Sequence, residues 1–282
     1  MLSRAVLAGA TPLADVLYGV DNTFLSRALD TGILSAYRPA GLEQIPPEFL
    51  LDPLNRAIPI DYGDVCVNYD KAYFQREGIA PPATLEDLAG PGYRGQLVVQ
   101  NPSSSSPGLA FLLATVARYG TNYLDYWRRL MANDVLVVED WATAYYQEFS
   151  GSSGAGLRPL VVSYGSSPPF EVIYAETPLT EPPTGVVSGP GTCFRQIEFA
   201  GILKGTPVPD LARQWMDFML SLEFQEDLPL SMFVFPIRPD AALQDEFLRY
   251  LVVPDQPARL DPQVIAENRE RWLREWTQTV LR

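Results

Sequence analysis

The segment Val161-Val162-Ser163-Tyr164-Gly165-Ser166-Ser167-Pro168-Pro169-Phe170 decides the fold class, because an apolar run ends there in small hydroxyl residues and a glycine. This pattern is typical of a buried strand that leads into a loop at its carboxyl end, where open α/β sheets bind ligands. Residues 97–108 repeat the arrangement, with an apolar run followed by four consecutive serines. The two units predict a polar ligand held at strand ends, and they indicate no reaction.

Alternating strand and helix patterns along the rest of the chain predict an α/β fold. We expect further strands at 14–20, 57–70, 135–138, 199–205 and 233–237. We expect helices at 1–9, 23–30, 107–119, 122–131, 141–149, 209–220 and from Pro262 onward. Thr84 is expected to cap a short helix, and the Pro- and Gly-rich residues 176–192 to form a loop or hairpin. The length of the 57–70 run suits a strand that crosses between lobes.

The composition excludes several classes of function. The chain has 282 residues, of which 47% are hydrophobic, enough for one large or two moderate domains. Its formal net charge of -13 argues against nucleic acid binding and favours a cationic small molecule, although acidity also serves solubility. The chain has no histidine, which removes Ser-His and Cys-His nucleophiles and the commonest metal ligand.

The two cysteines and the amino terminus also limit the interpretation. Cys66 and Cys193 form no CxxC motif, and two buried free thiols are favoured over a disulfide because Cys66 lies in an apolar strand.

No run of about 18 apolar residues predicts a membrane span. No signal peptide is visible at Met1, and the helix-like opening predicts that a first strand and helix precede it.

Three groups of side chains are candidates for ligand contacts. The serines at 103–106 precede a helix start and suit either an anion site or a simple helix cap. Trp141 stands at a strand–helix junction, where its face can stack on a planar ligand and add about 0.5–2 kcal/mol if the ligand is cationic. The alternative is a core tryptophan. Tyr145 and Tyr146 resemble the adjacent tyrosines of ferric-ion binders, but one core and one surface residue are favoured.

Three carboxylates in the sequence allow an alternative to a binding protein, namely an enzyme. Glu198 enters an apolar strand and therefore needs a cation, a hydrogen-bond donor or a place at a rim. Asp61, Asp64 and Glu198 could serve a hydrolase that uses paired carboxylates. No sequence pattern shows the pairing that such chemistry requires, so this reading ranks last.

Several short motifs occur along the chain in the order found in one known family. These are residues 14–22, 61–63, 69–71, 100–102, 105–109, Trp141, 144–145, 163–168 and 272–276. Because it contains these motifs in this order, the chain resembles the thiamine-binding proteins of ABC importers, within the superfamily of extracytoplasmic solute-binding proteins. The resemblance covers essentially the whole chain.

The resemblance implies a two-lobed α/β fold of the periplasmic-binding-protein type II, with a ligand clamped between the lobes. One lobe would comprise residues 1–62 and 198–232, its first strand and helix missing. The other would comprise residues 66–195 and 238–282. Hinge crossings are expected near 61–66, 195–200 and 233–237, where bending closes the lobes.

The resemblance also implies the site and the function. The expected ligand-binding residues are Ser105, Ser106, Trp141, Tyr164, Gly165, Ser166, Ser167 and Phe170, with Asp61, Tyr62 and Glu198 as secondary candidates. The expected protein is a monomeric, extracytoplasmic binding protein that delivers thiamine or its phosphates to a membrane permease. It would use no cofactor or metal and would not be an enzyme. Ferric ion or a polyamine is the alternative ligand.

Overall fold

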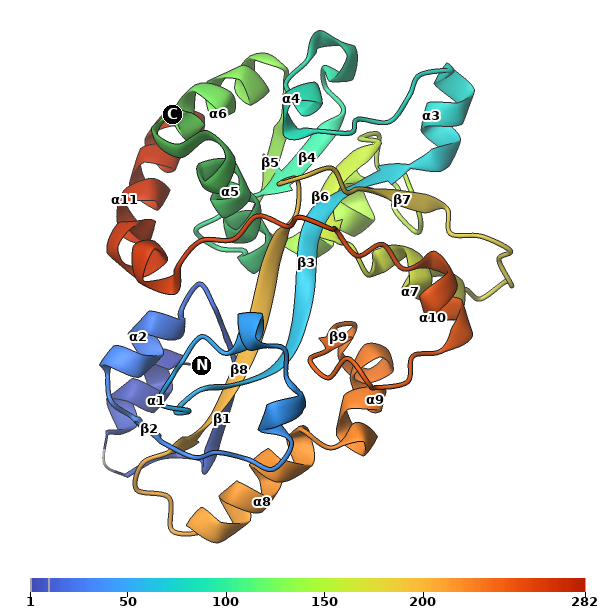
Figure 1. Cartoon of the computed structure of the whole chain (residues 1–282). Helices are drawn as coiled ribbons and strands as arrows, with labels where there is room; N and C mark the ends of the chain where they lie inside the picture. Colours follow the sequence, from blue (N-terminus) through green and yellow to red (C-terminus); the bar gives the residue numbers. More distant parts are fainter. Residues whose placement is uncertain (1, 10, 282) are drawn as a thin grey trace. The chain divides into compact units, whose positions relative to one another are not determined.

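The computed structural model describes residues 2–9 and 11–281, which alternate between strands and helices (Figure 1). The chain divides into two compact units, each assembled from three separate segments. Unit 1 comprises Met1–Gly63, Gln196–Leu243 and Asp261–Glu267; unit 2 comprises Asp64–Arg195, Gln244–Leu260 and Asn268–Arg282. The lobe limits and hinge positions given above stay predictions.

The strands of unit 1 pair in antiparallel fashion. They are β1 (Val16–Asp21), β2 (Leu34–Ser35), β9 (Phe235–Pro236) and parts of β3 (Ile58–Asp70) and β8 (Phe194–Leu203). Strands β1 and β2 both pair with β8, and β9 pairs with β3. Strands β3 and β8 are neighbours in the sheet and each contributes residues to both units.

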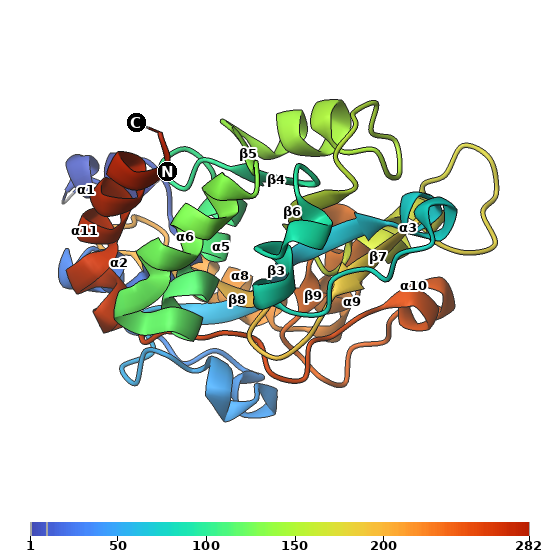
Figure 2. The same cartoon turned by 90° about the horizontal axis from the view of Figure 1, so that it is seen from above.

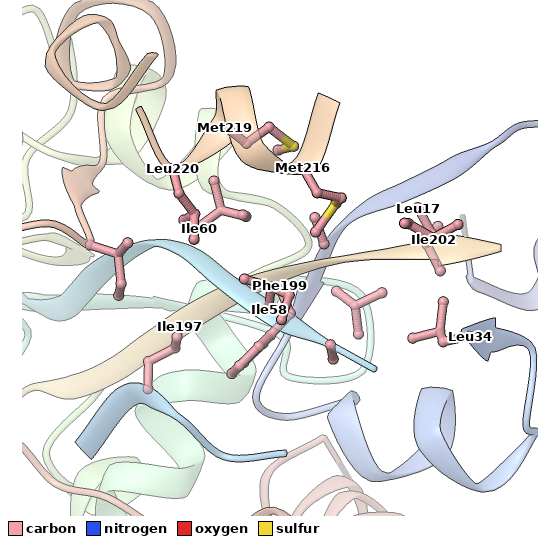
Figure 3. Packing of buried hydrophobic residues seen from close by; sticks show 14 of the residues in the cluster. Leu17, Leu34, Ile58, Ile60, Ile197, Phe199, Ile202, Met216, Met219 and Leu220 are labelled. Carbon is pink, nitrogen blue, oxygen red and sulfur yellow. The ribbon is translucent and has the colours of Figure 1, made fainter. Parts of the chain in front are cut away.

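Helices cover the unit 1 strands with apolar side chains. They are α1 (Leu2–Ala8), α2 (Leu25–Asp30), α8 (Pro209–Met219), α9 (Leu222–Met232), the 3-10 turns η1 (Leu42–Gln44) and η2 (Pro47–Phe49), and the first residues of α11 (Pro262–Val280). Ala212, Met216 and Met219 recur at helical spacing on one face of α8 and are buried. Figure 3 shows Met216 and Met219 directed toward the strand residues Ile60 and Phe199.

The strands of unit 2 form a mixed arrangement around β6 (Leu160–Tyr164). Strand β6 pairs antiparallel with β3 and parallel with β4 (Leu97–Gln100), and β4 continues parallel to β5 (Leu136–Val138). Strand β7 (Thr184–Val187) also pairs with β3. Strands β4 and β6 are buried almost throughout, as parallel strands covered on both faces require.

Helices pack against the unit 2 strands. They are α3 (Lys71–Glu77), α4 (Leu85–Leu88), η3 (Pro91–Tyr93), α5 (Ser106–Tyr119), η4 (Gly120–Asn122), α6 (Tyr123–Ala132), the π-helix η5 (Thr143–Glu148), α7 (Ser167–Ile173), α10 (Asp245–Tyr250) and most of α11. Helices α5, α6 and α11 lie side by side (Figure 2). Trp127 joins them, because its indole Nε1 donates to Thr115 and its ring packs edge-on against Trp276.

Most predicted elements occur within two residues of their expected limits. The long strand at 57–70, the helices at 107–119 and 122–131, and the helix that begins at Pro262 are confirmed. Thr84 caps α4 in a reciprocal capping box with Asp87, as predicted. Local propensity and core burial agree at these places, so the sequence pattern alone determines the element.

Other predictions need correction. The predicted strand at 233–237 shrinks to the two residues of β9, because the unpredicted helix α9 occupies the preceding residues and is capped by Phe233, whose φ is 61°. The predicted helix at 141–149 is a π-helix over Thr143–Glu148. Strand β8 begins at Phe194 rather than at 199. Helices α7 and α10 were also not predicted.

The prediction of free thiols is wrong, because Cys66 and Cys193 form a disulfide. Cys66 lies within β3, and Cys193 immediately precedes β8, the neighbouring strand. Burial in an apolar strand suits a thiol and a disulfide equally well. What decides between them is the strand order, which brings together residues separated by 127 positions.

Candidate ligand-binding site

Trp141 is held by hydroxyl groups at the carboxyl end of β6. Its indole Nε1 donates a hydrogen bond to Ser163 Oγ at 2.9 Å, and Ser163 is fully buried on β6. The Ser163 and Ser167 hydroxyl oxygens lie 3.2 Å apart. The Ser163 hydroxyl, with Ser167 beside it, therefore orients the indole, and Trp141 itself remains partly exposed.

Tyr145 supports the Trp141 ring from within unit 2. The two rings stack at 4.8 Å between centroids with 21° between their planes, and Tyr145 is only 4% exposed. The next residue, Tyr146, points outward with 48% exposure. The prediction of one core and one surface tyrosine is thus confirmed, and it disfavours an iron site made by the two hydroxyls together.

Glu171 is a residue that the sequence reasoning missed. It lies on α7, where its Oε1 accepts a hydrogen bond from the Tyr145 hydroxyl and its Oε2 accepts one from Thr184 Oγ1 at 2.6 Å. Burial raises the pKa of Glu171. Burial also raises the pKa of Tyr145, and the negative charge of Glu171 raises it further. The available signal was the Ser-Pro-Pro helix start, which places Glu171 in the second turn of α7.

The predicted recognition loop is a strand-to-helix junction. Tyr164 ends β6, the Gly165 backbone N–H donates to the Asp64 carbonyl at 2.8 Å, and α7 begins at Ser167. A Cβ at Gly165 would lie 3.3 Å from Cys66 Sγ, so the junction packs closely on the disulfide. Ser166 is buried, whereas Ser167 faces Ser163.

Phe170 is not brought to the Trp141 ring. It is 8% exposed, and its ring lies 5.2 Å from that of Phe247 on α10 and 6.2 Å from that of Tyr174. Its expected stacking on a ligand stays a prediction. The ring contacts place Phe170 in the small core between α7 and α10.

The serines that precede α5 divide into a helix cap and exposed residues. Ser105 is the cap, since its Oγ accepts the backbone N–H of Gly108 at 3.4 Å, and Ser106 is exposed at the helix start. Ser104 Oγ donates to the Glu139 carbonyl at 2.7 Å and to its carboxylate at 3.0 Å. The helix-cap interpretation is confirmed for Ser105, and ligand contacts of Ser105 and Ser106 stay predictions.

A carboxyl group in unit 1 is buried without full hydrogen bonding. Asp61 is 0% exposed; its Oδ2 accepts the Tyr18 hydroxyl, and its Oδ1 has no hydrogen-bond partner within the described chain. Burial, followed by the charge of Glu198, raises the pKa of Asp61 well above its ordinary value. Burial, followed by the charge of Asp21, raises that of Glu198. A positive charge nearby would stabilise the ionised forms of Asp61 and Glu198.

The other candidates near β3 have structural partners. Both Asp64 carboxylate oxygens accept hydrogen bonds from Arg195, at 2.9 and 2.7 Å. The Tyr62 ring lies 5.1 Å from those of Phe49 and Phe235. Asp64 is therefore committed to an ion pair, which makes it a poor candidate for a catalytic carboxylate in the hydrolase alternative.

The raised pKa values predict a pH dependence of stability. The ordinary values are 3.8 for Asp61 and 4.5 for Glu198, so the folded chain holds protons that the unfolded chain releases above about pH 4. The free energy of unfolding should fall as the pH rises through this window. Asp61→Asn should make that fall smaller in urea unfolding from pH 4 to 8. Asp210→Asn, at an exposed site, is the control, and an Asp61→Asn curve parallel to wild type contradicts the prediction.

Two features are absent from the described residues. No helix there combines the length and the apolar character that a membrane span requires. No three or more of the residues Cys, Asp and Glu gather there in an arrangement that could hold a metal ion.

Comparison with known proteins shows the family to which the chain belongs. The family model of the bacterial extracellular solute-binding proteins matches residues 11–252, and the chain belongs to this family. The α/β fold predicted from the resemblance is that of the two-lobed periplasmic binding proteins and is confirmed.

Several individual proteins are similar to this chain over most of their length. The thiamine-binding periplasmic protein of Salmonella typhimurium is 29% identical, with 100% of this chain and 81% of the relative covered. That of Escherichia coli is 28% identical with the same coverage. The solved structure of a periplasmic thiamin binding protein has a TM-score of 0.82 at 26% identity, covering 100% of this chain and 83% of that chain. The ferric binding protein from Campylobacter jejuni, at 20% identity and a TM-score of 0.74, covers 99% of this chain and 87% of that chain and shares the fold.

Proposed function

We propose that the chain is the solute-binding component of an importer and that its ligand is thiamine. The observation that carries the proposal is the Trp141 ring, which Ser163 and Tyr145 hold in one orientation while part of it stays exposed. Thiamine has a planar pyrimidine and a cationic thiazolium, and both suit an aromatic face. The relatives named for thiamine support this choice over other solutes.

The charge distribution supports a cationic ligand. The chain carries a net charge of -13, and Asp61 holds a buried oxygen without a hydrogen-bond partner in the described part of the chain. A ligand with a fixed positive charge favours the ionised form of nearby carboxyls. We therefore propose that the acidic character of the chain favours a cationic ligand such as thiamine.

The serine loop before α5 favours free thiamine over its phosphates. The Glu139 carboxylate accepts hydrogen bonds from Asn101 Nδ2 at 3.3 and 3.2 Å and from Ser104 Oγ at 3.0 Å. A carboxylate beside the serines repels a phosphate and occupies the Ser104 hydroxyl, which would otherwise donate to it. Phosphate esters are thus the weaker ligands in this proposal.

The remaining parts of the proposal follow from the family. The chain would act outside the cytoplasmic membrane as a monomer, without a cofactor and without turnover of its ligand. It would present thiamine to the membrane permease of an ABC importer. The extracellular solute-binding family and the periplasmic relatives support this placement.

Trp141 variants test the proposed ligand contact. Trp141→Ala should weaken thiamine binding by about 10- to 30-fold, because stacking and cation–π attraction of about 1.4–2 kcal/mol are lost. Trp141→Phe should retain part of the affinity. Trp215→Phe is the matched control, since Trp215 is 47% exposed on α8 in unit 1. Calorimetric titration measures all three, and an unchanged affinity of Trp141→Ala would refute the assigned contact.

A further inference from the structure

Glu171 connects three elements of unit 2 through hydroxyl groups. Its carboxylate lies on α7 and accepts from Tyr145 on η5 and from Thr184 on β7. Thr184 is 0% exposed, so this hydrogen bond is made away from solvent. A carboxylate that is satisfied by neutral hydroxyl donors forms short, strong hydrogen bonds and fixes the donors in place.

Tyr145 transmits this constraint to Trp141. The Tyr145 ring stacks on the indole at 4.8 Å and also contacts Phe149, with centroids 5.6 Å apart. A tyrosine ring that is anchored at its hydroxyl cannot swing away from the ring that it supports. The stack on Tyr145 and the hydrogen bond to Ser163 therefore set the plane and the direction of the indole, and the Tyr146 ring lies edge-on to it at 5.4 Å between centroids.

The backbone provides a separate reason to expect function here. Residues Thr143–Glu148 form a π-helix, whose wider turn is rare and is frequently found at functional sites. In an α-helix the positions of Trp141 and Tyr145 would be one turn apart on one face. Tyr145 lies within this π-helix and Trp141 lies two residues before its start, and the two rings are stacked.

We propose that Glu171 is a positioning residue that sets the affinity for the ligand by fixing Trp141 through Tyr145; the proposal rests on the assignment of Trp141 to the thiamine site. Glu171 does not itself touch the ligand in this scheme. Because the Trp141 ring is held in place before binding, the ligand does not have to order it, and affinity increases.

Three substitutions separate this role from a general effect on folding. Glu171→Ala removes both acceptors and should weaken thiamine binding about tenfold. Glu171→Gln keeps one carbonyl oxygen for the Tyr145 hydroxyl and should stay within about threefold of wild type. Tyr145→Phe keeps the ring but loses the hydroxyl, which also bonds Ser152 and Ser167, so it should weaken binding at least as much as Glu171→Ala. The double variant Glu171→Ala with Tyr145→Phe should be no worse than Tyr145→Phe alone, since the Glu171 connection is already lost there. Glu176→Ala, at an exposed position, is the control.

A spectroscopic measurement without ligand makes the result independent of the proposed function. The near-UV circular dichroism of the stacked pair, obtained by subtracting the Trp141→Phe spectrum, should decrease in Glu171→Ala and persist in Glu171→Gln. An unchanged Trp141 signal in Glu171→Ala overturns the proposal, whatever happens to affinity, and so does an additive double variant. If wild type binds no thiamine, the proposed function fails, yet the ligand-free spectra still decide whether Glu171 positions Trp141.

Discussion

Replacing Cys66 and Cys193 together by serine is expected to lower the free energy of unfolding by about 2–5 kcal/mol. The disulfide closes a loop between residues 127 positions apart, and chain entropy places the effect of so long a loop near the upper end of that range. The bond also links β3 to the residue before β8, and Gly165 packs against it. Its loss therefore affects the support of the β6–α7 junction.

Urea unfolding of the oxidised protein, the reduced protein and the double serine variant measures this effect. The reduced protein and the variant should agree, and reductant should not change the variant further. A difference below about 0.5 kcal/mol between wild type and the variant would contradict a structural role for the disulfide, since surface substitutions commonly produce changes of that size.

Arg195→Ala is expected to destabilise the chain by about 3–5 kcal/mol. Arg195 and Asp64 form an ion pair at 2.7 Å with side-chain exposures of 9% and 0%. Removal of Arg195 leaves the Asp64 carboxylate buried without its cation, which costs more than the ion pair itself contributes. Unfolding in urea at neutral pH measures the change.

Two further variants identify the cause of that change. The double variant Asp64→Leu with Arg195→Met removes both charges and should be more stable than Arg195→Ala alone. Arg213→Ala, which breaks an exposed ion pair with Asp210, should change stability by less than about 1 kcal/mol. If Arg195→Ala is as mild as Arg213→Ala, the Asp64 carboxylate is not effectively buried.

The elements that sequence reasoning identified are those in which local signals and burial coincide. The long strand Ile58–Asp70 is almost continuously buried, and the helix Ser106–Tyr119 follows a serine cap with proline at its start. Family resemblance rather than periodicity identified the class of protein. The helix Leu222–Met232 was missed because it contains Pro229, a residue that ordinarily argues against a helix interior.

The parts of the site that could not be predicted depend on long-range contacts. The position of Trp141 was suggested by its strand–helix junction, but its hydrogen bond to Ser163 joins residues 22 positions apart. The Glu171 carboxylate accepts hydrogen bonds from the hydroxyls of Tyr145 and Thr184, which are 26 and 13 positions away. The Tyr18 hydroxyl reaches Asp61 across 43 positions. Each of these contacts depends on strand order, which single-residue patterns do not encode.

Calorimetric titration of the full chain with thiamine tests the central claim most directly. The account predicts saturable binding of one thiamine per chain and weaker binding of thiamine monophosphate. Ferric citrate and spermidine should produce no saturable heat. Absence of thiamine binding up to about 1 mM ligand, or tighter binding of ferric ion or spermidine, would contradict the account.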